Sequence, residues 1–402
     1  MSADSRSVRR ATEVSVAYGR VGDMSVWADL VGQDAVVATL RRAVAGGPHA
    51  MTHAWLVTGP PGSGRSNAAR AFAAALQCDR GGCGDCKACR TALSGAHPDV
   101  TIVRTEQLSI GVDEVRGLVR RAAMSPTLGR RQVIVVEDAD RITERGADAL
   151  LKAIEEPAPK TVWVLCAPTA DDVVVTIRSR CRAVHLTTPT ASAIARLLEQ
   201  RDGVDAAMAG FAARVAQGHI GRARALARDE ASRIRRRDVL QIPPELVTLG
   251  ACLRAAANVI AVSTEEAESQ TADRNAREVA ELNEALGFGT KGARPRNAHA
   301  AVKDLEEQQK ARAKRFQRDA LDRVLTELTT YYRDVLTVQM ETGAGLINTE
   351  CAGAIEKVAR RTAPEQTMRR LDAILAARTA LETNVAPLLA MEALMVQLAE
   401  SL

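Results

Sequence analysis

The sequence has no apolar run as long as a membrane span, and its N-terminus is polar where a secretory signal would be apolar. Both absences predict a cytoplasmic chain without a membrane partner. Charge of either sign is not in large excess, since 54 basic against 49 acidic side chains leave +5. That balance is too weak by itself to indicate a nucleic-acid-binding protein. Aromatic residues are scarce, at 2%, and alanine and valine carry much of the apolar content.

What the chain has is length and an ordinary apolar content. Its 402 residues, 46% of them hydrophobic, predict two or three domains that each bury a core. We expect an extension over residues 1–23 and an α/β domain over 24–187. A helical lid is expected over 188–243. A helical domain, interrupted by a flexible insert at 284–300, is expected over 244–402, with Pro243-Pro244 at the boundary.

A glycine- and proline-rich loop stands between an apolar run at Trp55 and an alanine-rich helical segment from Asn67. It resembles the phosphate-binding pattern G-x-x-x-x-G-K-[ST]. Glycines there let backbone N–H groups and the N-terminus of a helix point at an anion. The candidate nucleotide-binding residues of the loop are Gly59, Pro60, Pro61, Gly62, Ser63, Gly64, Arg65 and Ser66.

Arg65 occupies the lysine position of that pattern. Lysine is a compact point charge, whereas arginine is longer, planar and forked, so the exchange is not conservative. Two interpretations stay open: a loop that still binds ATP or ADP, and a relic that only joins a strand to a helix.

Four cysteines follow the loop with the spacing C-x4-C-x2-C-x2-C. Cys78, Cys83, Cys86 and Cys89 lie within twelve residues, and turn glycines separate them. This arrangement predicts a structural zinc site with four thiolate ligands and no open position. An iron–sulfur cluster and redox thiols are the alternatives. The other cysteines, at 166, 181, 252 and 351, are expected to be ordinary small buried residues.

Strands and helices alternate from residue 54 to 186, which predicts a mostly parallel sheet covered by helices. The apolar run from Gln132 to Val136 reads as a buried strand and ends in Glu137 and Asp138. Carboxylates at that end of a strand hold Mg²⁺ in P-loop NTPases, as the Walker B motif does. The plainer interpretation is solvated charge at a strand end.

Several segments together resemble the clamp-loader branch of AAA+ ATPases. They are LVGQ at 30–33, SIGVDEVR at 109–116, ALLKAIEEP at 149–157 and TIRSRC at 176–181. These segments stand at the expected distances from a P-loop with an inserted four-cysteine knuckle. The resemblance implies a P-loop (AAA+) domain, an all-α lid and an all-α C-terminal collar.

The resemblance also assigns roles to residues. Val31, Gly32 and Gln33 would line the adenine side of the nucleotide site, and residues 167–169 would cover the sensor 1 region. The second sensor arginine would fall near Gly221, with Arg222 one place away. Glu137 and Asp138 stand in swapped order relative to an active motor, and Asp138 is one methylene shorter than the usual catalytic glutamate.

Arg180 would reach into the ATP site of a neighbouring subunit as an arginine finger. Such fingers typically contribute ~10³–10⁵ in rate. The alternative for Arg180 is a structural salt bridge beside Cys181.

At the level of the whole protein, the resemblance implies a stator. It would join gamma/tau motor subunits and a delta subunit in a five-membered ring that loads the sliding clamp onto primed DNA. Its own ATP site would be degenerate. An active gamma/tau-like motor is the alternative, and Arg65 speaks against it. Direct nucleic-acid binding by the cysteine knuckle is not favoured, because Asp79 and Asp85 offset its basic residues and no aromatic side chain there offers a stacking platform.

Overall fold

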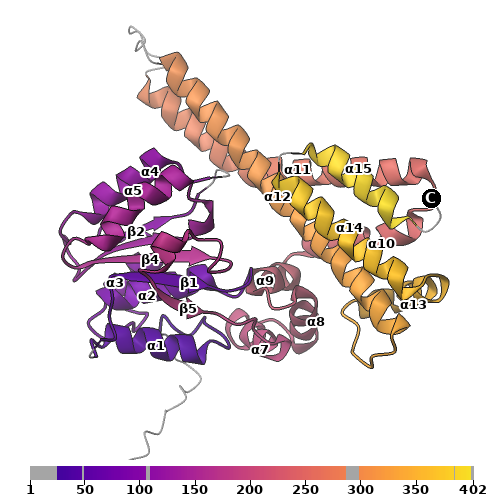
Figure 1. The fold of residues 1–402 in the computed structure, drawn as a ribbon, viewed down its shortest axis with the longest axis horizontal. Helices are drawn as coiled ribbons and strands as arrows, with labels where there is room; N and C mark the ends of the chain where they lie inside the picture. Colours follow the sequence, from indigo (N-terminus) through magenta and orange to yellow (C-terminus); the bar gives the residue numbers. More distant parts are fainter. Residues whose placement is uncertain (1–24, 48, 106–108, 287–297, 384, 400–402) are drawn as a thin grey trace, which may run out of the picture.

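The computed structural model describes residues 25–47, 49–105, 109–286, 298–383 and 385–399. The extension predicted for residues 1–23 lies outside the described residues, as does most of the predicted insert, residues 287–297. Figure 1 shows a sheet domain, a small group of helices beside it, and a long helical hairpin leading into a bundle.

The first part of the chain alternates strands and helices. Its elements are α1 (Asp34–Val44), β1 (Ala54–Thr58), α2 (Arg65–Gln77), α3 (Lys87–Ser94), β2 (Val100–Val103), α4 (Val112–Ala122), β3 (Gln132–Val136), η1 (Ala139–Arg141), α5 (Glu144–Glu155), β4 (Thr161–Ala167), α6 (Val175–Arg178) and β5 (Arg182–His185).

The rest of the described chain is helical. Its elements are α7 (Ala191–Asp202), α8 (Ala206–Ala216), α9 (Ile220–Arg228), α10 (Glu230–Glu245), α11 (Leu249–Ala285), α12 (Ala298–Gln339), η2 (Thr349–Cys351), α13 (Ala352–Arg361), α14 (Pro364–Glu382) and α15 (Pro387–Leu398).

Within the described residues the strands form one sheet in the order β2-β3-β4-β1-β5, and all of its pairings are parallel. The predicted parallel sheet is therefore confirmed. β1 lies inside the sheet, between β4 and the edge strand β5, so the loop that follows it emerges from the carboxyl edge between these two strands. Ligand sites of open α/β sheets lie at this edge.

Both faces of the sheet are buried, because successive side chains of a strand point to opposite sides. Trp55 and Val57 of β1 pack on the face covered by α1, α2 and α3. Leu56 packs on the other face, against α4 and α5. This double burial explains why the strands read as continuous apolar runs and not as alternating ones.

Helices α7, α8 and α9 share a small core of their own, and this group of helices, which lies in the predicted lid, is called the lid below. α10 starts at Asp229, whose carboxylate accepts hydrogen bonds from the backbone N–H groups of Ala231 and Ser232. Leu240 of α10 packs in the core of the C-terminal bundle. α10 continues through Pro243 and Pro244 to Glu245, so these prolines lie in its last turn and not between two helices. The predicted limits of the domains remain predictions.

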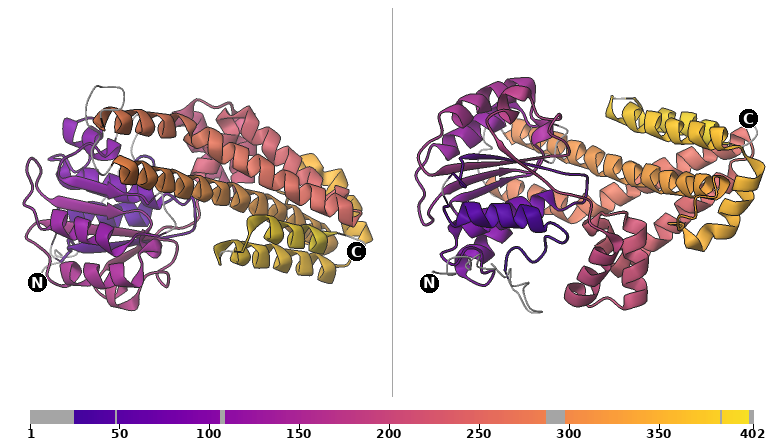
Figure 2. Two further views of the ribbon diagram at one scale, coloured as in Figure 1. Left: turned by 90° about the horizontal axis from the view of Figure 1, so that it is seen from above. Right: turned by 60° about the horizontal axis from the view of Figure 1, so that its bottom comes forward.

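The long helices α11 and α12 lie side by side as an antiparallel hairpin, which both views of Figure 2 show. α13, α14 and α15 pack against the bundle end of this hairpin, around Leu325, Leu328 and Tyr332 of α12. The C-terminal part is thus largely helical, as predicted. Among the described helices, none combines the length and the apolar character needed to cross a membrane.

Candidate nucleotide and metal sites

The predicted phosphate loop has the backbone of such a loop. It leaves β1 at Gly59 and enters α2, with Gly64 as the N-cap residue at φ 97°. Gly62, at φ 79°, also lies in the left-handed region that favours glycine. Ser63 is buried, and its hydroxyl oxygen has no hydrogen-bond partner within the described chain. The loop therefore keeps a shape that can surround an anion.

Arg65 does not extend from this loop as a free cation. Its guanidinium donates a hydrogen bond to the carbonyl oxygen of Gly59, at the other end of the same loop. The side chain is thereby folded over the loop and partly neutralises a backbone dipole. This geometry gives a physical reason why arginine is a poor substitute for the phosphate-binding lysine.

The lid packs against the phosphate loop through His219. A Cβ atom added to Gly62 would lie 2.1 Å from the ring carbon Cγ of His219, so only glycine fits there. The N–H of Ile220 also donates to the Gly62 carbonyl, at 3.2 Å. Burial, and then the nearby charge of Arg222, lower the pKa of His219. The neutral ring fits its position, because Nδ1 accepts the N–H of Arg222 and caps α9.

Both predicted Walker B carboxylates are paired inside the chain. Glu137, which is buried, accepts a hydrogen bond at 2.7 Å from Nε of Arg70 on α2. Asp138 pairs at 3.3 Å with Arg315, which comes from the long helix α12. A carboxylate paired with arginine is a poor ligand for Mg²⁺, since its charge is already compensated.

The segment predicted to line the adenine side has structural partners as well. The buried side chain of Gln33 donates to the carbonyl of Thr187 at 2.7 Å and accepts the N–H of Thr187 at 3.0 Å. Val31 packs against the core of the lid. Gly32 has φ 72°, which allows the turn between them. Val31, Gly32 and Gln33 thus join the sheet domain to the lid.

The predicted sensor residues lie near the loop but have other contacts. Pro168 accepts the N–H of Gly59 at 3.0 Å, so the end of β4 supports the start of the phosphate loop. Arg222 forms an ion pair with Glu327 of α12, and both side chains are about nine-tenths buried. In this arrangement Arg222 joins the lid to the long hairpin.

Arg180 lies just beyond α6 on the surface of the sheet domain. Its guanidinium pairs with Glu155 of α5 at 2.6 Å and donates to the Thr176 carbonyl at 2.7 Å. The side chain is 39% exposed, so a neighbouring subunit can reach it. The structure contains the salt bridge of the plainer interpretation, and the finger role stays a prediction.

The four clustered cysteines come together as their spacing predicts. Their sulfur atoms all lie within 4.8 Å of one another, and three of the pairs are 3.6, 3.8 and 4.0 Å apart. A tetrahedral shell with metal–sulfur bonds of about 2.3 Å has sulfur atoms about 3.8 Å apart. The donor set therefore fits a metal ion held by Cys78, Cys83, Cys86 and Cys89.

Backbone groups support two of these sulfurs. Sγ of Cys78 accepts the N–H of Arg80 at 3.3 Å, and Sγ of Cys86 accepts the N–H of Cys89 at 3.4 Å. Burial opposes ionisation of Cys78, but the backbone donors of Cys83, Gly82 and Arg80 outweigh it and lower its pKa to about 6. Backbone donors of this kind favour the thiolate that a metal requires.

The remaining cysteines lie apart from this cluster. Cys166 and Cys252 are buried, as predicted, whereas Cys181 and Cys351 are only half-buried. Burial raises the pKa of Cys181 to about 12. These four residues are ordinary thiols of the fold.

Comparison with known proteins bears on the predicted resemblance to clamp-loader subunits. Residues 32–190 match the family model described as "DNA polymerase III, delta subunit". The delta' subunit of DNA polymerase III from Pseudomonas aeruginosa is 39% identical over 142 residues, which are 34% of this chain and 43% of that protein. The resemblance to clamp-loader subunits is confirmed. The Escherichia coli delta' subunit is 34% identical over 143 residues, again 34% and 43% of the two chains.

Gamma/tau subunits are similar to this chain as well. The gamma/tau subunit of Mycobacterium tuberculosis H37Rv is 35% identical over 159 residues, or 38% of this chain and 27% of that protein. The chain thus spans less than half the length of each of these relatives.

Sequence reasoning missed three side chains that contact the candidate nucleotide-site residues. Arg70 lies one turn into α2, His219 lies at the start of α9, and Arg315 lies 177 positions beyond its partner Asp138. Only Arg70 is near a motif in sequence, and nothing in its own pattern marks it. The other two positions depend on how separate domains pack.

Proposed function

We propose that this chain is a delta-prime-type subunit of the DNA polymerase III clamp loader, a replication accessory factor and not an ATPase of its own. It would stand with gamma/tau and delta subunits in the AAA+ ring that places the sliding clamp on primer-template DNA. Its role there would be that of a stator. The similarity of residues 32–190 to delta' subunits supports the family of the complex.

The proposed lack of ATPase activity rests on one observation: the candidate nucleotide-site residues are already engaged by other groups of the chain. Arg65 bonds its own loop, and His219 covers Gly62. Glu137 and Asp138 are held by Arg70 and Arg315. Hydrolysis would need a free cation on the β/γ-phosphates and a free carboxylate near the metal.

The second part of the proposal is that Arg180 contributes to the ATP site of a neighbouring subunit. It is exposed, and it belongs to the TIRSRC segment that carries the resemblance. Its pair with Glu155 is a partly exposed surface ion pair, which costs little to exchange for a phosphate in another subunit.

The test measures Mg-ATP turnover by the full chain alone and with a gamma/tau-type partner. We expect no turnover alone, and partner turnover that falls at least about a hundredfold on Arg180→Ala. Arg178→Ala is the matched control, because Arg178 is also an arginine of this segment and is paired with an aspartate, Asp171. Glu155→Ala should leave partner turnover intact, because it frees Arg180.

Robust turnover by the chain alone would overturn the stator assignment. The gamma/tau relatives make an active motor the second candidate. Arg65→Lys separates the two: strong hydrolysis gained by this one change would mean that only the phosphate loop had drifted.

We further assign zinc to the four-cysteine cluster. Thiolate ligands and closed tetrahedral spacing favour Zn²⁺ in a structural role. Metal analysis of the purified chain should find one zinc per chain and no iron or acid-labile sulfide.

A further inference from the structure

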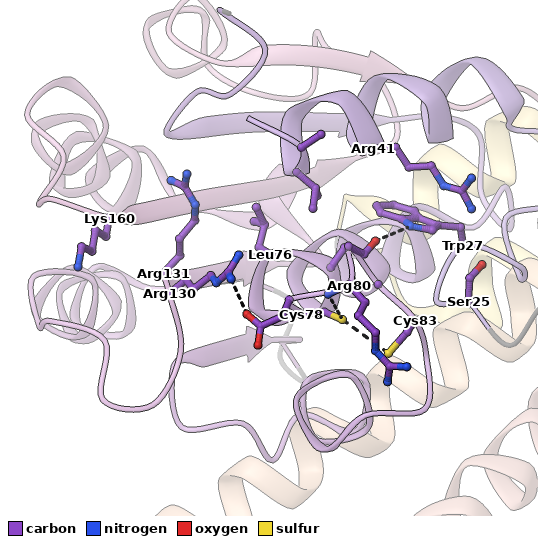
Figure 3. A pocket seen from close by; sticks show the side chains of 16 residues that line it. Ser25, Trp27, Arg41, Leu76, Cys78, Arg80, Cys83, Arg130, Arg131 and Lys160 are labelled. Atoms are coloured by element: carbon purple, nitrogen blue, oxygen red, sulfur yellow. Dashed lines mark hydrogen bonds and ion pairs between the residues drawn. The ribbon is translucent and has the colours of Figure 1, made fainter. Parts of the chain in front are cut away.

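A large cavity lies beside the cysteine cluster, away from the phosphate loop. Its volume is about 950 Å³, and none of the P-loop residues lines it. Figure 3 shows five cationic side chains around it. They come from α1, the cysteine loop, the turn before β3 and the turn before β4, and they are Arg41, Arg80, Arg130, Arg131 and Lys160.

Two of these cations are compensated by acidic neighbours. Arg80 pairs with Asp85 at 2.8 Å, and Arg130 pairs with Asp79 at 2.5 Å. Asp85, and then the sulfur of Cys83, raise the pKa of Arg80. Arg80 thus offsets negative charge of the cysteine cluster itself.

The other three cations are uncompensated. Within the described chain, the side chains of Arg41, Arg131 and Lys160 make no hydrogen bond or ion pair. Arg41 and Lys160 are exposed and Arg131 is half-buried. Asp79 is the one acidic side chain that lines the cavity, and it is already paired with Arg130. The cavity therefore carries a net positive charge.

The turn that contains Arg130 and Arg131 is held in place by hydrogen bonds to the side chains of Asp99 and Gln77. The carboxylate of Asp99 accepts the N–H groups of Thr127, Leu128 and Gly129. Gln77 accepts the N–H of Arg130 and donates to the carbonyl of Arg131 at 2.6 Å. These hydrogen bonds fix the backbone from which both arginines extend.

The apolar and aromatic residues that line the cavity indicate which class of anion it can bind. Among the described apolar residues that line it, Trp27 and Leu76 are each 5% exposed and Ala75 is 1% exposed, while Val44 is half-buried and Ala45 is exposed. The lining thus offers only a small apolar surface to anchor a side chain of an acidic peptide. The indole N–H of Trp27 donates to the Gly81 carbonyl at 3.2 Å, so that ring is committed to the fold. Since the lining lacks an exposed aromatic ring, bases cannot stack there.

We propose that this cavity is a binding site for the sugar-phosphate backbone of nucleic acid, without sequence preference. The uncompensated cations come from three separate segments and can each meet a different phosphate along one strand, which is the usual positioning contact of a DNA-binding protein. The site is distinct from the nucleotide site and from the metal, and its place in replication rests on the proposed clamp-loader role, which brings the chain to DNA. The sequence disfavoured nucleic-acid binding by the cysteine knuckle itself, but Arg41, Arg131 and Lys160 lie outside that knuckle.

The experiment measures binding of a fluorescein-labelled DNA duplex, about 30 base pairs long, to the full, zinc-loaded chain by fluorescence anisotropy between about 50 and 200 mM salt. The test variant combines Arg41→Ala, Arg131→Ala and Lys160→Asn. Asparagine is chosen at 160 because Lys160 has φ 67°, which asparagine tolerates. The matched control combines Lys357→Ala, Arg361→Ala and Arg369→Ala, three exposed cations of the bundle that also lack partners there.

Every phosphate that is no longer neutralised should reduce the slope of log affinity against log salt by about 0.9, so the slope of the test variant should fall by about 2.7. We expect its affinity at about 100 mM salt to fall at least tenfold, and that of the control to stay within about twofold. An unchanged slope in the test variant, or an equal loss of affinity in the control, would overturn the proposal. So would binding of a poly-glutamate peptide that depends on the same three residues when the duplex does not bind. Zinc content and melting temperature of both variants show whether they are folded.

Discussion

At the scale of single residues, Asp99 shows how one carboxylate organises a surface. Burial alone would raise its pKa, but hydrogen bonds from the backbone N–H groups of Thr127, Gly129 and Leu128 outweigh burial and lower it. The donor–acceptor distances are 2.6, 2.5 and 2.8 Å in that order. Asp99 stabilises the folded chain as an anion.

We therefore expect Asp99→Asn to lower the free energy of unfolding by about 2 kcal/mol at pH 7. A lowered folded-state pKa gives stability that is present above the unfolded value, about 3.9, and is lost as the pH falls through the folded value. The difference between wild type and variant should thus shrink on acidification below about pH 4. Urea unfolding at several pH values measures it. Asp113→Asn, at a 92% exposed side chain, should show no such trend. A difference that stays constant with pH would contradict this account.

The residue scale also shows where sequence reasoning succeeds. The clustering of the four cysteines was predictable because their geometry depends on local spacing, within twelve residues. Glu137 and Asp138 were correctly placed at a strand end, but the arginines that pair with them were not predicted. Arg70 and Arg315 reach them through packing between elements, and a single sequence carries no periodic signal for such contacts.

At the scale of elements, the strands and helices were predictable because two-sided burial and helical spacing leave clear patterns. The predicted helix after the phosphate loop starts at Arg65 and not at Asn67, since Gly64 is the N-cap residue. The two prolines at 243 and 244, which mark a predicted domain boundary, lie inside α10. Burial of Leu240 in the bundle holds this helix, and the prolines fall in its final turn.

The cysteine loop is the element that we expect to depend on the proposed metal. It leads into α3, a helix of 8 residues, which is too short to be stable alone. The loop also holds residues outside itself, because the Gly82 carbonyl accepts the N–H of Val26 at 3.0 Å. We expect chelation of the metal, or Cys89→Ser, to lower the melting temperature by on the order of 5 °C.

Hydrogen exchange localises that effect. Amides of α3 should exchange at least tenfold faster after metal removal, while those of α14 should not change. Cys351→Ser, at a half-buried cysteine of the bundle, is the control and should retain one metal per chain. Unchanged exchange in α3 would show that the cysteines hold the loop without a metal.

At the scale of the whole molecule, α12 connects three parts of the chain. Arg315 pairs with Asp138 of the sheet domain, and Glu327 pairs with Arg222 of the lid. Farther along, Leu328 and Tyr332 lie in the core of the bundle. Figure 1 shows this helix passing all three regions.

We expect Arg315→Ala to loosen the sheet domain from the hairpin. The pair is mostly buried, at 11% and 22% side-chain exposure, so leaving Asp138 without its partner should cost about 1–3 kcal/mol. Amides near Asp138 should exchange faster, and small-angle scattering should show a larger radius of gyration. Arg323→Ala removes a more exposed pair with Glu266 from the same helix and should change neither quantity. Equal effects of the two variants would mean that Arg315 is not the connection.

The spacing of the two ion pairs along α12 has a geometric consequence. Arg315 and Glu327 are twelve positions apart, which is about three and a third turns, so they point about 120° away from each other around the helix axis. That angle sets the orientation of the sheet domain relative to the lid. One residue added between them would turn one ion pair by about 100° relative to the other and shift it by about 1.5 Å along the axis. The number of residues between the two ion pairs on α12 therefore fixes the angle at which the sheet domain and the lid face each other.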